Sequence, residues 1–98
     1  MKKKGRTITL SATSVEKIIN DLSLLVVSMD RIGSTYYNKP RKQALELDNF
    51  LAEINAFKRL AQARGVLSEA YENQSSKLLV TRSEEKAEAL PYWRCKKT

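Results

Sequence analysis

Histidine is absent from this chain of 98 residues, and cysteine occurs once, at Cys95. The lack of histidine excludes the commonest general base and every metal site that needs an imidazole ligand. The single cysteine excludes an intramolecular disulfide, and without histidine there is also no cysteine–histidine nucleophile pair. We therefore expect a protein that is not an enzyme and that carries neither a metal nor a cofactor.

Glycine and long apolar runs are also scarce. The three glycines do not have the spacing of a phosphate-binding loop. The most apolar stretch, residues 22–29, is eight residues long, whereas a membrane-spanning helix needs about 20. Threonine and serine follow the basic start of the chain, where a secretory signal would have an apolar region. We expect a cytoplasmic protein with no membrane partner, and the low cysteine content suits a reducing compartment.

Basic residues outnumber acidic ones by 18 to 11, and the excess lies mainly toward the N-terminus. Residues 1–42 carry a net charge of +6, residues 43–93 carry −2, and residues 94–98 carry +3. Basic charge gathered in one region favours a partner rich in phosphate. A merely solubilising tail would also explain the run of lysines at the start.

Two long amphipathic segments predict a mostly α-helical single domain built on a two-helix hairpin. The first helix is expected over residues 12–33, opened by a capping box at Thr13–Glu16 and closed by Gly33. The second is expected over residues 39–64, with Pro40 in its first turn and Gly65 after its end. The apolar stripe of the first helix is wider than one partner helix would cover, which predicts self-association.

The ends of the chain complete the expected domain, which covers residues 1–98. Polar and apolar residues alternate over residues 6–11, which predicts a short strand after a basic arm. Shorter helical segments are expected over residues 66–90, followed by Tyr92 and Trp93 packed as an anchor. An alternative interpretation of residues 57–76 is a helix-turn-helix.

The N-terminal segment, residues 2–11, resembles the start of ribbon-helix-helix DNA-binding proteins in its run KKKGRTITLS before a capped helix. In that family, two strands of a dimer enter the major groove and short polar side chains read base edges. The resemblance implies that Thr7 and Thr9 face bases. It also implies that phosphates are met by Lys2, Lys3, Lys4 and Arg6.

This resemblance covers residues 2–22, and the first helix here is longer than is usual in the family. Residues 24–33, with the helix around Leu51, Ile54 and Leu60, are similar to plasmid relaxosome accessory proteins, which join such a head to a helical tail. The alternative is that the N-terminal segment is only an arm that caps a helical bundle.

A second basic group opens the second predicted helix. Lys39, Arg41 and Lys42 lie where a helix N-terminus already favours anions. Tyr36 and Tyr37 precede them and offer rings on which a base stacks. A solvated first turn with both tyrosines folded onto the bundle is the plainer interpretation.

Together these patterns favour a small basic DNA-binding protein that also binds itself, such as a regulator or a plasmid or phage accessory protein. The alternative is a helical protein–protein module, for instance a phage-encoded inhibitor or adaptor. Such a module would bind an acidic protein surface or an anionic nucleotide.

Overall fold

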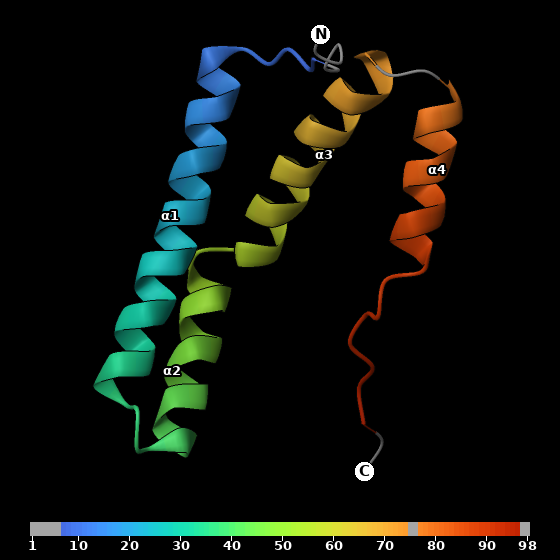
Figure 1. Ribbon diagram of the computed structural model, residues 1–98. Coiled ribbons are helices and arrows are strands. Elements are labelled where there is room, and N and C mark those ends of the chain that lie inside the picture. Colours follow the sequence, from blue (N-terminus) through green and yellow to red (C-terminus); the bar gives the residue numbers. More distant parts are fainter. Residues whose placement is uncertain (1–6, 75–76, 97–98) are drawn as a thin grey trace, which may run out of the picture.

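The structure is a computed structural model that describes residues 7–74 and 77–96 (Figure 1). Within these ranges the chain forms helices and no strand. The helices are α1 (Ala12–Thr35), α2 (Pro40–Glu53), α3 (Ala56–Gln74) and α4 (Lys77–Glu88). The mostly helical fold class predicted from the sequence is confirmed. None of these helices is long and apolar enough to cross a membrane.

The residue that caps α1 lies before the predicted capping box. Ser11 has the extended backbone of an N-cap, and its Oγ accepts a hydrogen bond from the Ser14 N–H at 3.1 Å. Thr13, the predicted cap, already lies inside the helix. Gly33 also lies inside it, because α1 continues to Thr35 and Gly33 keeps a negative φ. The predicted roles of Thr13 and Gly33 are therefore wrong.

The predicted second helix is divided into α2 and α3. The break lies at Ile54 and Asn55, where Asn55 has a left-handed φ of 60° that asparagine tolerates better than most residues. α3 then passes through Gly65 without interruption, and a Cβ added to Gly65 would meet no atom within 4 Å. Gly65 therefore does not end a helix, and the helix-turn-helix interpretation of residues 57–76 is wrong.

The helices form an antiparallel hairpin with one further helix attached. α1 runs in one direction, and α2 and α3 return beside it in the opposite direction (Figure 1). Gln43 on α2 donates from its side-chain amide to the Gly33 carbonyl at 3.3 Å, which links the two helices next to their turn. α4 contacts α3 and no other helix. The molecule is elongated, with extents of 52 × 35 × 28 Å.

The core of this hairpin is thin. Its buried apolar residues are Leu25 on α1 and three alanines on α3, namely Ala56, Ala63 and Ala70. These alanines are spaced seven positions apart, so they share one face of α3. Their small side chains allow a close approach to α1. No large side chain of the described residues is completely enclosed, so one chain by itself buries little apolar surface.

The predicted N-terminal strand is not formed over the described residues 7–11. The backbone at Thr9 is held by a side chain instead. Its N–H donates to Gln74 Oε1, and Gln74 Nε2 donates to the Thr9 carbonyl, both at 2.9 Å. Gln74 at the end of α3 thus supplies the donor and the acceptor that a neighbouring strand would supply.

The chain after α4 also differs from the expectation. The Tyr92 hydroxyl donates to the Ala87 carbonyl at 2.6 Å, which folds that side chain back onto the end of α4. Tyr92 and Trp93 nevertheless remain 63% and 83% exposed. The predicted aromatic anchor is therefore wrong, because neither ring is buried against the described helices.

Candidate nucleic-acid interface

The turn between α1 and α2 positions the predicted basic cluster. The Tyr36 N–H closes the last turn of α1 on the Ile32 carbonyl at 3.1 Å, and the Lys39 N–H bonds to the Tyr36 carbonyl at 2.9 Å. Lys39 is the N-cap residue of α2 but its side chain makes no capping hydrogen bond, and the first turn of α2 holds no acidic residue. This helix end thus keeps its positive field and free N–H donors.

Three exposed cations stand on this turn. Lys39, Arg41 and Lys42 are exposed, and none of them pairs with a carboxylate of the described residues. With Pro40 they border a shallow hollow on the surface. Tyr37 is 79% exposed, whereas Tyr36 is half-buried. The structure therefore brings together every predicted residue of this group, which we call the turn cluster: Tyr36, Tyr37, Lys39, Arg41 and Lys42.

The other predicted contacts lie at the opposite end of α1. Thr7 and Thr9 are exposed and come just before α1, while the turn cluster follows its C-terminus (Figure 1). The 24 residues of α1 separate the two groups by about 36 Å at 1.5 Å per residue. They do not form a single site on one chain. The remaining predicted contacts lie outside the described residues: Lys2, Lys3, Lys4 and Arg6.

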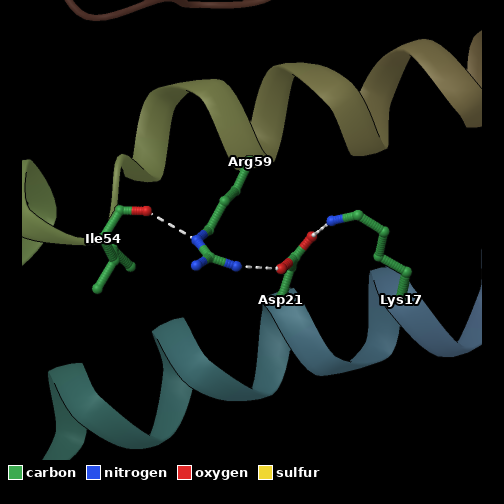
Figure 2. Close-up of polar contacts among 4 residues, drawn as sticks. All are labelled: Lys17, Asp21, Ile54 and Arg59. Atoms are coloured by element: carbon green, nitrogen blue, oxygen red, sulfur yellow. Dashed lines mark hydrogen bonds and ion pairs between the residues drawn. The ribbon is translucent and has the colours of Figure 1, made fainter.

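A buried, doubly paired carboxylate among the described residues was not predicted. Asp21 on α1 is 5% exposed and is the buried charged residue of the described chain. Its Oδ2 lies 3.0 Å from Lys17 Nζ and its Oδ1 lies 2.7 Å from Arg59 Nη1 (Figure 2). Arg59 Nε also donates to the Ile54 carbonyl at 2.7 Å. We call Lys17, Asp21 and Arg59 the charged clasp.

The charged clasp ties together the three helices of the hairpin. Arg59 belongs to α3, Ile54 ends α2 and Asp21 belongs to α1 (Figure 2). Hydrogen bonds from Lys17 and then Arg59 hold the pKa of Asp21 below its ordinary value, against the opposing effect of burial. The carboxylate is charged at neutral pH and both of its oxygens are occupied. Its arrangement suits a structural contact.

The sequence contains a signal for the charged clasp at Asp21, but it does not identify the partner of that carboxylate. Asp21 stands three residues after Ile18 and four before Leu25, so it lies beside two apolar residues on one face of an amphipathic helix. A charge at such a position requires a partner. Arg59 lies 38 residues away along the chain, so the folded hairpin alone identifies it.

A crevice between α1 and α3 adjoins the clasp. It holds about 290 Å³ of empty space and is lined by Ser14, Lys17, Ile18, Asp21, Gln62, Ala63 and Val66. Over the described ranges, no group of three or more histidine, cysteine, aspartate or glutamate residues is placed to hold a metal ion. The turn cluster is therefore the best-formed candidate for a binding surface.

Comparison of this chain with protein-family models, with curated proteins and with solved structures gave no match.

Proposed function

We propose that this protein is a small basic DNA-binding protein that contacts the phosphate backbone through the turn cluster. The observation that carries the proposal is the juxtaposition of three exposed cations, Lys39, Arg41 and Lys42, without a carboxylate partner among the described residues. Unpaired cations that are exposed on this turn are free to replace the counterions of a polyanion, which is the main source of affinity for DNA.

The exposed tyrosine supports the same assignment. Tyr37 stands two residues before Lys39 in the chain and is 79% exposed, and exposed aromatic rings near basic residues stack on unpaired bases. The basic N-terminal residues, from Lys2 to Arg6, belong to the proposal on the strength of the sequence. Contacts at both ends of α1 would spread over the phosphate backbone, so affinity with little sequence preference is expected.

The test compares two variants with the same change in charge. Fluorescence anisotropy of a labelled duplex is measured over a series of salt concentrations. The variant K39A/R41A/K42A should bind more weakly than the natural chain, and its salt slope should fall by about 0.9 for each phosphate that is no longer neutralised. The control K58A/R82A/K86A removes three exposed cations from α3 and α4 and should keep the natural slope. Equal weakening of DNA binding in both variants would mean that the affinity depends only on the net charge of the protein.

The alternative function is a protein–protein module, and the C-terminal segment favours it. Trp93 is 83% exposed and stands between Tyr92 and Arg94, and these residue types carry much of the energy at protein interfaces. If the natural chain shows no affinity for duplex DNA at low salt but binds polyglutamate, the DNA proposal fails and an acidic protein partner takes its place.

A further inference from the structure

We infer that the hairpin binds a second copy of itself through the outer face of α1 and α3. This inference does not rest on the proposed contact with DNA. It begins from a mismatch on α1 between the face that is apolar and the face that is buried. The inward face of α1 includes Ser14, Asp21 and Ser28, while a row of apolar side chains beside it stays exposed.

The exposed row follows a regular spacing. Its members are 37% to 65% exposed and recur at alternating steps of four and three, as in the seam of a helical bundle. We call these residues the α1 row: Val15, Ile19, Leu22, Val26 and Met29. The hairpin itself leaves this row uncovered, and a contiguous apolar face of this kind marks an interface.

α3 carries a matching row. Relative to the buried Leu25, the α1 row places Ile19, Leu22 and Met29 at offsets of −6, −3 and +4. The same offsets from the buried Ala63 give the α3 row, which is Phe57, Leu60 and Leu67, and these are 43% to 83% exposed. Equal offsets on two antiparallel helices lie on the same side of the pair. The two rows therefore form one apolar face.

The two rows also match in height. Asp21 contacts Arg59 and the two helices are antiparallel, so a residue that follows Asp21 on α1 lies level with the residue that precedes Arg59 on α3 by the same number of positions. Leu22 is thereby within a turn of the level of Leu60. A second copy that places its α3 row on this α1 row joins leucine to leucine.

The surface area points to the same occupant. The chain exposes 8716 Å², whereas a compact protein of 11.2 kDa exposes about 5,700 Å². The excess of about 3,000 Å² includes α4 and the segment after it, yet it is well above the roughly 800 Å² that each partner buries in a stable interface. Two hairpins packed face to face make a four-helix arrangement and supply the core that one chain lacks.

The test is the mass in solution of two matched variants. Val26 belongs to the α1 row, whereas Val27 is the same residue type about 100° further round the helix. Both are exposed, at 65% and 47%. By sedimentation, the natural chain and Val27→Glu should have twice the 11.2 kDa of one chain, and Val26→Glu should be a monomer with its helical circular dichroism intact.

A second pair of substitutions tests how the copies meet, and it gives an answer even if Val26→Glu does not fold. Leu22 and Leu60 are 46% and 43% exposed, and Leu22→Glu and Leu60→Lys each place one charge in the apolar face, so each should weaken the dimer. The double variant L22E/L60K, which brings opposite charges together between the copies, should restore it. A monomeric natural chain, or equal disruption by Val26→Glu and Val27→Glu, would overturn the inference. Failure of the double variant to restore the dimer would overturn the pairing of α1 with α3. DNA affinity in a monomer would leave the proposed function standing.

Discussion

The molecule has two regions, the hairpin of α1, α2 and α3 and the C-terminal arm, which is α4 with residues 89–96. Both consist of amphipathic sequence, but different contacts hold them in place. The hairpin has a buried leucine, three buried alanines and the charged clasp. α4 has no buried residue, and the Tyr71 hydroxyl reaches it through one hydrogen bond to the Leu79 carbonyl at 3.3 Å. Burial, and not helix length, separates the two regions.

This difference has a physical cause in the partners that each helix finds. α1 meets both α2 and α3 along its length, while α4 meets α3 alone. Most of the stability of a helix in a protein comes from the packing of its apolar face rather than from intrinsic propensity. We therefore expect the hairpin to dominate the free energy of unfolding and the arm to open locally at lower cost.

The largest expected effect tests this contrast with one type of substitution in each region. Leu25→Ala, in the hairpin core, should lower the free energy of unfolding by about 2–5 kcal/mol, because it removes a buried side chain. Leu78 on α4 is 60% exposed, so Leu78→Ala should cost less than about 0.5 kcal/mol. Urea denaturation at one fixed protein concentration measures both. Equal destabilisation would show that α4 is packed as firmly as α1.

A smaller effect, dependent on pH, should come from the charged clasp. The depressed pKa of Asp21 means that its stabilising contribution is fully present above the ordinary carboxyl pKa, about 4. The contribution disappears as the pH falls through the lower native pKa. Acidification should therefore destabilise the natural chain more than Asp21→Asn, which is already weaker at neutral pH. The free energies of unfolding of the two chains at neutral pH and at about pH 3 give the answer, and parallel curves would contradict it.

The smallest expected effect concerns the hairpin itself. It is a change in stability at Gly65, and the sign of that change is informative. Gly65 lies within α3 with open space around it, so Gly65→Ala should stabilise the chain by about 0.5–1 kcal/mol through the lower entropy of the unfolded state. Thermal denaturation at fixed protein concentration measures this change. A decrease in stability would mean that residue 65 has a left-handed backbone, which is the conformation of a glycine that ends a helix.

Local patterns in the sequence determined the helical class, the absence of histidine chemistry and the position of the turn cluster. The three-and-four spacing of apolar residues marks α1, and Pro40 marks the start of α2 within one residue of the expectation. Lys39, Arg41 and Lys42 stand together because they are neighbours in the chain. Features of this kind depend on residues a few positions apart, and periodicity and composition are sufficient to find them.

Tertiary structure decided the features that depend on distant residues. The sequence predicted that helices end at Gly33 and Gly65, yet both residues lie inside helices. The break between α2 and α3 falls at Asn55. The side chain of Gln74, not a strand, pairs with Thr9. Asp21 faces inward because Arg59 returns beside it from the other arm of the hairpin, and this turns part of the apolar stripe of α1 outward. Which side of an amphipathic helix is buried depends on the partners it meets, and those partners lie far away in the sequence.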